Sequence, residues 1–350
     1  MPSHAVISGA GIAGPALAHQ LTARGWSTTV LERFPQRRDE GQNVDVRGAA
    51  REVVRRMGLD GAIRAANTGE IGTRFVRADG SPAASFPVGG PGDNDGPTAE
   101  LEILRGELSR ILIENTPGTD YRFGVQISDV TDDGDRVRIA LHDGTSLDAD
   151  LLVIAEGLHS RSRRFVTSVD VTDLGMYFAY ATIPRLDSDD RWWNWQHVTE
   201  SRAVHLRPDN LGTTRAILTF ISDVRGFEEL DRTGQLTILR RTFADVGGAA
   251  PRVLAELENG AHVLLGCRAG AQPDMEQRQD RAIGRFRVLQ RNIWRCRNQS
   301  GTHRRLHPGR RTRRRRGGDS CAAPLRTRDE AVHRLRTHGA RQGAAARQSP

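Results

Sequence analysis

The sequence predicts an α/β fold with a three-layer dinucleotide-binding domain, an inserted β-sheet domain and an irregular C-terminal tail. Three observations lead to this prediction. An apolar segment at residues 5–8 runs straight into a glycine-rich turn and then a helical pattern. Residues 151–155 form a second continuous apolar run, which is typical of a buried parallel strand. Beyond about residue 262 the hydrophobic periodicity fails.

Charge divides the 350-residue chain into an acidic body and a basic tail. Residues 265–350 hold 22 Arg and 6 acidic residues, a net charge of +16, whereas the body has a net charge of −8. All three cysteines also lie in the tail, which excludes a disulfide framework or a cysteine-based metal site in the body. No secretory signal or membrane-length apolar run is present, so we expect a cytoplasmic protein with no membrane segment.

Local patterns assign the elements of both domains. In the first domain we expect strands at residues 5–8, 28–31, 125–130, 137–142, 146–147 and 151–155, and helices at residues 15–24, 49–57 and 101–114. In the second we expect a hairpin over residues 72–88, strands at residues 176–183, 192–198, 203–206 and 214–221, a turn at residues 207–212, and a helical pattern over residues 227–258. Residues 1–70 and 98–168 then form the dinucleotide-binding domain, residues 71–97 and 169–260 the inserted sheet domain, and residues 261–350 the tail.

The glycine-rich turn at residues 9–14 reads Gly-Ala-Gly-Ile-Ala-Gly, which matches the Rossmann-type G-x-G-x-x-G pattern. The first glycine permits a tight turn, the second lets backbone approach a diphosphate, and the third lets the helix pack on the strand. The helix start also offers unpaired N–H groups to phosphate oxygens. Glu32 ends the second strand at the expected spacing, where an acid binds ribose hydroxyls and repels a 2′-phosphate. NADP is therefore not the ligand expected at this loop.

Three further segments favour FAD over NAD. Residues 148–163 are a strand that ends in Glu156-Gly157 and continues into Ser and Arg residues. Arg105 stands at the head of an amphipathic helix, and residues 41–48 carry Asp45 between two glycines. At these residues the chain resembles the FAD-dependent aromatic hydroxylase family (para-hydroxybenzoate hydroxylase-like), and within it the tetracycline-inactivating flavin monooxygenase type. The resemblance covers about residues 4–260 and implies a Rossmann-like FAD-binding domain.

The resemblance implies an FAD site built from several segments. Asp45 falls where relatives place an acid near the flavin, and Arg38 is a looser match to a residue implicated in NADPH contact. The second fingerprint normally reads Asp-Gly, so Glu156 sets the carboxylate one methylene further out. The implied cofactor-binding residues are Gly9, Gly11, Ile12, Ala13, Gly14, Glu32, Arg33, Arg38, Asp45, Arg105, Glu156 and Gly157.

The resemblance implies NADPH- or NADH-dependent monooxygenation of a small aromatic substrate, with FAD and molecular oxygen. Because the cofactor carries the chemistry and the protein positions it, no catalytic side chain is expected. The cluster at residues 192–195, Trp-Trp-Asn-Trp, either lines a pocket for a flat substrate or packs within its sheet. Tyr177 and Tyr180 allow the same two interpretations. His197 and His205 are expected to be neither ligands nor bases.

Two other functions stay open. The first is a flavin-dependent dehydrogenase or reductase on the same fold. The second is a non-enzymatic protein, either a truncated flavoprotein or a binder of nucleic acid through the basic tail. The tail has only Phe286 and Trp294 as aromatic residues, which disfavours nucleic-acid binding by base stacking.

The tail also departs from the family pattern. The Gly-Asp segment that closes over the flavin near residue 280 in the family is absent. Met275 has the single codon ATG and the glutamate codons begin with G, so the +1 reading frame gives the Trp of the family at this point. With G+C-rich codons chosen, the same shift turns residues 303–316 and 325–327 into segments that resemble the late helices of the family. We therefore hypothesise that the chain from about residue 262 is a frameshifted translation, and we expect weak FAD retention and little turnover.

Overall fold

The computed structural model describes residues 2–38, 41–89, 98–99, 101–166, 171–259, 262–270 and 286–288. All of these residues lie within one compact unit, residues 1–298. None of the helices in this described part is long and apolar enough to cross a membrane.

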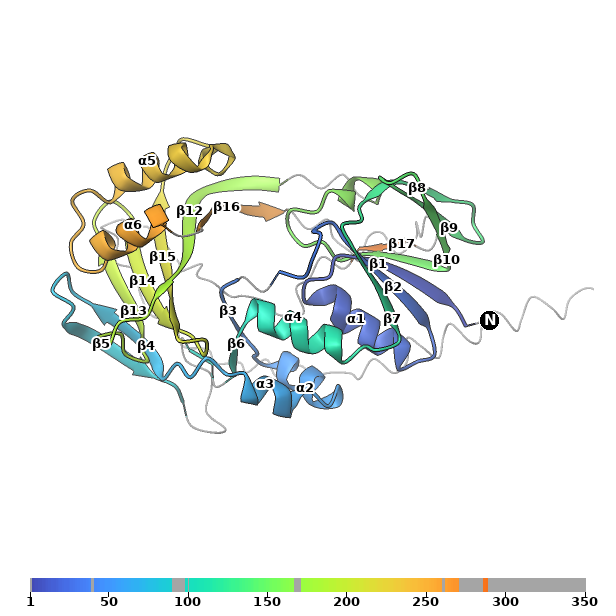
Figure 1. The fold of residues 1–350 in the computed structure, drawn as a ribbon, viewed down its shortest axis with the longest axis horizontal. Coiled ribbons are helices and arrows are strands. Elements are labelled where there is room, and N and C mark those ends of the chain that lie inside the picture. The colour runs from blue at the N-terminus through green and yellow to red at the C-terminus, as the bar shows by residue number, and fades with distance from the viewer. Residues whose placement is uncertain are drawn as a thin grey trace, which may run out of the picture. The chain divides into compact units, whose positions relative to one another are not determined.

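A five-stranded parallel sheet organises the dinucleotide-binding domain (Figure 1). Its strands stand in the order β17-β11-β1-β2-β7, so β1 lies between β2 and β11. Ile7 of β1 pairs with Val30 on one side and Val153 on the other. The strands are β1 (His4–Ser8), β2 (Ser27–Glu32), β7 (Thr119–Phe123), β11 (Leu151–Ile154) and β17 (Phe286–Val288).

Alternating side chains of this sheet build two cores. Val6 and Leu152 pack on one face against an antiparallel meander, β8 (Ile127–Asp132), β9 (Val137–Leu141) and β10 (Ser146–Ala149). Ile7 and Val153 point to the other face, where they meet Ala18 of helix α1 (Ala13–Thr22). Helix α4 (Arg105–Glu114) lies beside α1 on this side. The result is the predicted three-layer arrangement of meander, sheet and helices.

A second group of elements comes from residues 43–65 and residues 102–104. Helices α2 (Ala49–Arg56) and α3 (Asp60–Ala65) pack with α4 around a core that includes Val54, Ile63 and Leu112. The two short strands β3 (Asn43–Asp45) and β6 (Glu102–Leu104) pair in antiparallel fashion. This β3–β6 ribbon brings Asp45 opposite Glu102.

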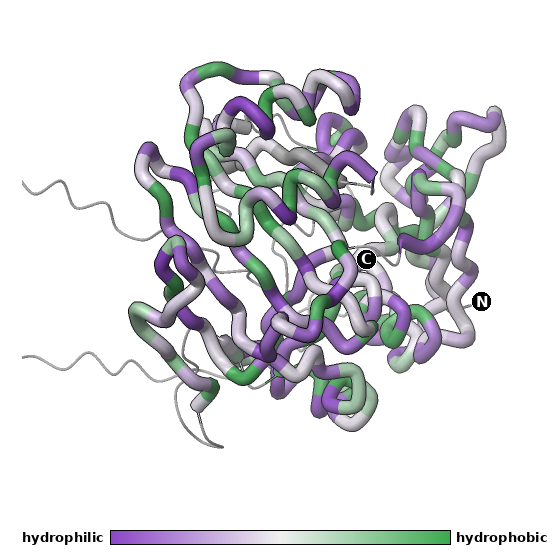
Figure 2. Tube along the Cα trace, turned by 60° about the vertical axis from the view of Figure 1, so that its left-hand side comes forward, coloured by the Kyte–Doolittle hydropathy of each residue, from purple (hydrophilic) through white to green (hydrophobic). Residues whose placement is uncertain are grey.

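The inserted domain is a seven-stranded sheet in the order β16-β12-β15-β14-β13-β4-β5. Its strands are β4 (Gly72–Val76), β5 (Pro82–Pro87), β12 (Val171–Pro184), β13 (Trp193–Val198), β14 (Arg202–Pro208), β15 (Thr213–Ile221) and β16 (His262–Gly270). One face packs under α5 (Arg232–Thr242) and α6 (Ala250–Asn259), with Val204 and Leu218 in that core. Figure 2 colours the chain by hydropathy and shows hydrophobic and hydrophilic residues interspersed along it. We call the face opposite α5 and α6 the inner face; it carries His205 and its neighbours Trp195 and Ile217.

Several elements differ from the sequence prediction. The helix predicted from residue 101 begins at Arg105, because residues 102–104 pair with β3 as a strand. Strand β7 joins the parallel sheet although residues 119–123 were not expected as a strand. Arg207 and Pro208 were expected in a turn, but they continue β14, and the turn comes at residues 209–212.

The predicted tail contains two described strands. The backbone of β16 pairs with β12, and the backbone of β17 extends the parallel sheet beside β11. The other residues of the predicted tail, and with them the positions on which the frameshift hypothesis depends, lie outside the described residues.

Candidate functional site

The three glycines of the loop after β1 serve different purposes. Gly9 has φ +111°, and a Cβ added to it would lie 2.6 Å from the carbonyl oxygen of Ala155. A Cβ added to Gly14 would lie 1.9 Å from the carbonyl oxygen of Gly9. At Gly11 the nearest atom to an added Cβ is Nη2 of Arg105, at 3.7 Å. The outer glycines therefore build the turn, and the middle one leaves open space beside a cation.

Backbone donors at the start of α1 face this open space. The N–H groups of Gly9 and Ala10 are used within the fold, by the Leu31 carbonyl and by Glu32. Within the described part of the chain, the N–H groups of residues 11–13 have no acceptor. The first turn of α1 also carries no acidic residue. Free N–H groups and the positive end of the helix dipole make this an anion-binding position.

Glu32 fixes the loop to the end of β2. Its carboxylate accepts hydrogen bonds from the N–H of Ala10 at 2.9 Å and of Phe34 at 3.1 Å. Two oxygens offer about four acceptor positions, so the carboxylate keeps capacity for the hydroxyls of a ribose. Arg33 and Arg38 both stack on the ring of Phe34, at 4.9 and 4.1 Å from its centroid. Arg33 and Arg38 thus lie close together just after Glu32, at the end of β2.

Helix α4 supplies two side chains to the loop. Arg105 is exposed, and its guanidinium lies near Gly11. One helical turn later, Ser109 is 5% exposed and its hydroxyl donates to the carbonyl oxygens of Ala10 and Gly11, both at 3.1 Å. Spacing of four residues puts both side chains on one face of the helix. Ser109 was not identified from the sequence, although its position four residues after Arg105 is the signal.

The Glu156-Gly157 turn follows β11 and lies beside the glycine loop. Glu156 accepts hydrogen bonds from the Ser8 hydroxyl at 2.5 Å, the Ser160 hydroxyl at 2.9 Å and the N–H groups of Arg161 and Ser162. Burial acts to raise the pKa of this carboxyl, but hydrogen bonds from Ser162 and Ser8 outweigh burial and lower it. The turn is thereby held to the end of β1 by an ionised carboxylate.

Arg163 holds the same turn from inside. Its buried guanidinium donates to the carbonyl oxygens of Gly157 at 3.0 Å and Leu158 at 2.5 Å. Gly157 has φ +78°, a conformation that side chains disfavour. The longer side chain of Glu156 is therefore accommodated in an ordered turn. Arg163, like Ser109, was not identified from the sequence.

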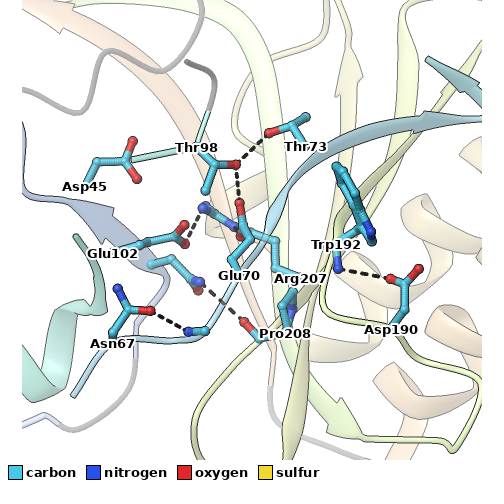
Figure 3. Close-up of polar contacts among 12 residues, drawn as sticks. Asp45, Asn67, Glu70, Thr73, Thr98, Glu102, Asp190, Trp192, Arg207 and Pro208 are labelled. Carbon is cyan, nitrogen blue, oxygen red and sulfur yellow. Dashed lines mark hydrogen bonds and ion pairs between the residues drawn. The ribbon is translucent and has the colours of Figure 1, made fainter. Parts of the chain in front are cut away.

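Asp45 lies apart from the glycine loop, on the β3–β6 ribbon. It forms an ion pair with Arg47 at 2.9 Å. Its strand partner Glu102 accepts a hydrogen bond from Arg207 of β14, and Arg207 also donates to Glu70 at 2.9 Å. In Figure 3 the Arg207 guanidinium lies between the carboxyl groups of Glu102 and Glu70. This cluster ties the inserted sheet to the ribbon that carries Asp45.

The aromatic residues of β13 lie on the inner face beside this cluster. Trp193 and Trp195 are 6% and 9% exposed, and their ring centroids are 4.6 Å apart. Arg207 stacks on Trp193 at 3.7 Å, and His205 contacts Trp195 edge-on at 4.3 Å. Burial lowers the pKa of His205 to about 3, with His197 and Arg207 adding to the effect, so its imidazole is neutral. The inner face is thus a packed aromatic surface next to charged groups.

Tyr177 and the two tryptophans of β13 differ in whether their polar atoms have hydrogen-bond partners. Tyr177 is fully buried under α5 and α6, and its hydroxyl donates to the Val224 carbonyl at 2.9 Å. It is therefore a packing residue. The indole N–H groups of Trp193 and Trp195 are buried without a hydrogen-bond partner in the described structure, as is Nδ1 of His205. Buried donors are normally paired, so these unpartnered atoms are unusual within the described structure.

The structure brings most of the predicted cofactor residues to one place. The glycine loop, Glu32, Arg105 and the Glu156-Gly157 turn all stand at the carboxyl ends of β1, β2 and β11. This edge is where open α/β sheets bind nucleotides. Asp45 is connected to this edge through Gln42, which precedes it in the same segment. The Gln42 carbonyl accepts a hydrogen bond from the N–H of Arg105 at 3.0 Å. Free N–H groups, a ribose-type acid and a nearby guanidinium fit the adenosine and diphosphate of FAD.

Several known proteins are similar to this chain in sequence. The FAD binding domain family matches residues 3–242. An uncharacterized protein of Mycobacterium tuberculosis is 35% identical over 257 residues, 71% of this chain and 68% of the relative. The flavin-dependent monooxygenase eupH of Phoma sp is 35% identical over 271 residues, 73% of this chain and 62% of the relative. The chain thus spans about two thirds of the length of these relatives.

The fold has solved counterparts as well. The crystal structure of tetracycline destructase Tet(51) superimposes with a TM-score of 0.68 at 24% identity, over 82% of this chain and 74% of that one. This likeness confirms the predicted α/β architecture with a parallel sheet and an inserted sheet domain. The family match confirms FAD as the cofactor, and the named relatives agree with the predicted class of enzyme. The chain therefore belongs to the FAD binding domain family and is an FAD-dependent oxidoreductase of the flavin monooxygenase type.

Proposed function

We propose that this chain binds FAD at the glycine loop and hydroxylates a small aromatic molecule held on the inner face, with NADPH or NADH as reductant. The buried, unpartnered indole N–H groups of Trp193 and Trp195 carry the substrate part of this proposal. An aromatic ligand with an oxygen acceptor would satisfy both donors and stack in a surface that already consists of rings. The neutral His205 offers a third polar atom to the same ligand.

The protein's own residues have binding and positioning roles in this proposal. The N–H groups of residues 11–13 and Arg105 would hold the diphosphate, and Glu32 would accept the ribose hydroxyls. FAD, when bound, supplies hydride acceptance and oxygen activation. The low exposure of Trp193 and Trp195 keeps water from the reacting part of the substrate.

Flavin binding is the first experiment. The full chain is titrated with FAD, and flavin fluorescence and the thermal midpoint are followed. We expect Gly11→Asp to abolish binding without unfolding the protein, because Gly11 has open space around it and a carboxylate there would repel the diphosphate. Arg241→Ala, an exposed arginine of α5, is the control and should bind as the parent does. Equal FAD affinity in Gly11→Asp and the parent would contradict the proposed cradle.

Turnover is the second experiment. NADPH or NADH oxidation and oxygen uptake are measured with a panel of phenols and other oxygen-bearing aromatic compounds. Hydroxylated product with matching oxygen uptake supports monooxygenation, whereas bound flavin and NAD(P)H oxidation without oxygen uptake indicate a dehydrogenase or reductase. We expect weak FAD retention and low turnover, because the Gly-Asp segment of the family is absent from the sequence.

A further inference from the structure

The β3–β6 ribbon places two carboxyl groups opposite each other. Asp45 and Glu102 are direct partners in the antiparallel register. Side chains at such positions have Cβ atoms about 5 Å apart. One oxygen of each group, Oδ1 of Asp45 and Oε2 of Glu102, is buried and has no hydrogen-bond partner in the described structure. Two unpartnered acceptors at facing positions are unusual, because buried polar atoms are normally paired.

The charges around Glu102 do not balance if every carboxyl is ionised. Glu102 and Glu70 have almost no exposed side-chain surface, 1% and 0%, and both face Arg207. Asp45 faces Glu102 from β3 and has its own pair with Arg47 on the more exposed side. One buried guanidinium thus serves two buried carboxyl groups, with a third carboxyl beside them. A buried carboxylate that lacks a full partner takes up a proton instead of remaining charged.

Other contacts assign this proton to Glu102 and not to Glu70. Glu70 has a partner for both oxygens: Thr98 donates to Oε1 at 2.5 Å and Arg207 donates to Oε2. Thr98 is itself 2.8 Å from the Thr73 hydroxyl, which completes the chain drawn in Figure 3. Glu102 has a partner for Oε1 only. Burial raises the pKa of Glu102 well above its ordinary value; Arg207 and a hydrogen bond with Asn43 oppose this, whereas Glu70 and Asp45 add to it.

We propose that Glu102 is a neutral, proton-carrying positioning residue whose Oε2–H faces Asp45 across the β3–β6 ribbon. The proton turns one of two facing acceptors into a donor, so a side-chain rotation or one bridging water satisfies both. Arg207 anchors this carboxyl pair to the inserted sheet, and through its stacking on Trp193 to the aromatic inner face. The pair therefore connects the surface proposed for the substrate with the acid that the family resemblance places near the flavin.

The existence of the proton does not depend on the proposed function, but its use in catalysis rests on it. A proton held at Glu102 keeps a second negative charge away from Asp45, the acid that the resemblance places near the flavin. Loss of the proton would add a buried negative charge to a region that already holds Asp45 and Glu70. The Asp45 carboxylate would then be pushed from its place, and the flavin-side geometry would change with it.

Infrared difference spectroscopy of the flavin-free full chain tests the proposal. A protonated carboxylic acid has a carbonyl stretch that carboxylates lack and that shifts in heavy water. We expect this band at neutral pH in the parent and its loss in Glu102→Gln. Glu107→Gln is the matched control, since Glu107 lies on α4 in hydrogen-bonded contact with Arg110, which lowers its pKa, and the band should persist. No band in the parent, or a band lost in Glu70→Gln but kept in Glu102→Gln, would overturn the assignment.

The pH dependence of stability is an independent readout. The folded-state pKa of Glu102 is raised, so its contribution to stability is complete below the unfolded-state value near 4.5 and is lost as pH rises through the folded-state value. Glu102→Gln mimics the protonated group and cannot ionise. The thermal midpoint of the parent should therefore fall relative to Glu102→Gln as pH increases, and a constant difference across pH would overturn the proposal. Failure of FAD binding would leave both measurements unchanged, so the two proposals fail separately.

Discussion

The glycine-loop edge and the inner face of the large sheet differ in which polar atoms they leave unpaired. At the loop edge, Glu32 and Glu156 accept hydrogen bonds from nearby backbone N–H groups, and Ser109 donates to two loop carbonyls. On the inner face and the adjoining ribbon, buried polar atoms of Trp193, Trp195, His205, Glu102 and Asp45 have no partner in the described structure. The first region leaves backbone N–H groups of residues 11–13 available, whereas the second leaves side-chain atoms available.

This difference shows how the two regions acquire their specificity. A nucleotide cradle built from backbone N–H groups needs glycines and tight turns, so its carboxylates are used to fix the loops. In the proposed function the inner face would recognise a ligand by side chains, and its unpaired polar atoms would be the groups that bind that ligand. The Arg207 cluster connects the inserted sheet to the β3–β6 ribbon. It is held together by buried charged side chains, whereas the loop edge is held together by hydrogen bonds to the backbone.

The largest expected effect comes from removing that link. Arg207→Met leaves Glu70 and Glu102 buried without their cation, and breaking a buried pair in this way costs about 3–5 kcal/mol. Chemical denaturation measures the loss in the free energy of unfolding. Arg240→Met is the matched control, because its pair with Glu258 is about half exposed and contributes less than about 1 kcal/mol.

A double variant separates charge from packing at this position. Adding Glu70→Gln to Arg207→Met removes the stranded charge of Glu70, so part of the lost stability should return. If the double variant is less stable than Arg207→Met alone, the guanidinium acts mainly by filling space over Trp193.

The next effect tests the scaffold side of the comparison. Gly14→Ala places a methyl group 1.9 Å from the Gly9 carbonyl oxygen, a backbone atom that moves only with the loop. Overpacking of this kind costs about 1–3 kcal/mol, and the displaced loop should also lose FAD. Gly61→Ala in α3 is the control, since nothing lies within 4 Å of its added Cβ and alanine favours helix. Unchanged stability and FAD affinity in Gly14→Ala would show that the loop is pliable.

The sequence predicts the loop edge well because that region follows local rules. Gly9, Gly14 and Glu32 are close in sequence, and each has a backbone requirement that only a few residue types meet. The strands follow from apolar patterns in the same way: six of the seven described strands of the large sheet were predicted, whereas β16 lies in the predicted tail. Asp143-Gly144 is a similar case, with φ +84° at the glycine of the predicted hairpin turn.

The ribbon and the Arg207 cluster could not be predicted from the sequence. Arg207 meets Glu70 and Glu102 across separations of 137 and 105 residues, and no local pattern encodes such pairs. Residues 102–104 follow a helical apolar spacing, yet tertiary pairing with β3 makes them a strand. Arg207-Pro208 looked like the start of a turn because proline is common there, but it ends β14, where Pro208 still pairs with Thr214.

A smaller effect is expected from the serine that holds the loop carbonyls. Ser109→Ala removes one hydroxyl that donates to Ala10 and Gly11, which costs about 1 kcal/mol of folding stability. The loop would be less well ordered, so FAD affinity should fall by a factor of about 5, the equivalent of that energy. Ser146→Ala, an exposed position in β10, is the control for both measurements. Normal FAD affinity in Ser109→Ala would mean that Glu32 alone orders the loop.

The smallest expected effect concerns the pH response of the second turn. Hydrogen bonds from Ser162 and Ser8 lower the pKa of Glu156 despite its burial, so its ionised form stabilises the fold. For a lowered pKa, that stabilisation is present above the unfolded-state value near 4.5 and is lost as pH falls through the folded-state value. Glu156→Gln keeps one acceptor oxygen but no charge, and solvent screening limits its cost at pH 7 to about 1 kcal/mol. The difference between parent and variant should shrink as pH falls below 4.5, opposite in direction to Glu102→Gln. If both variants respond to pH in the same direction, the contrast between a charged scaffold turn and a neutral carboxyl in the ribbon is wrong.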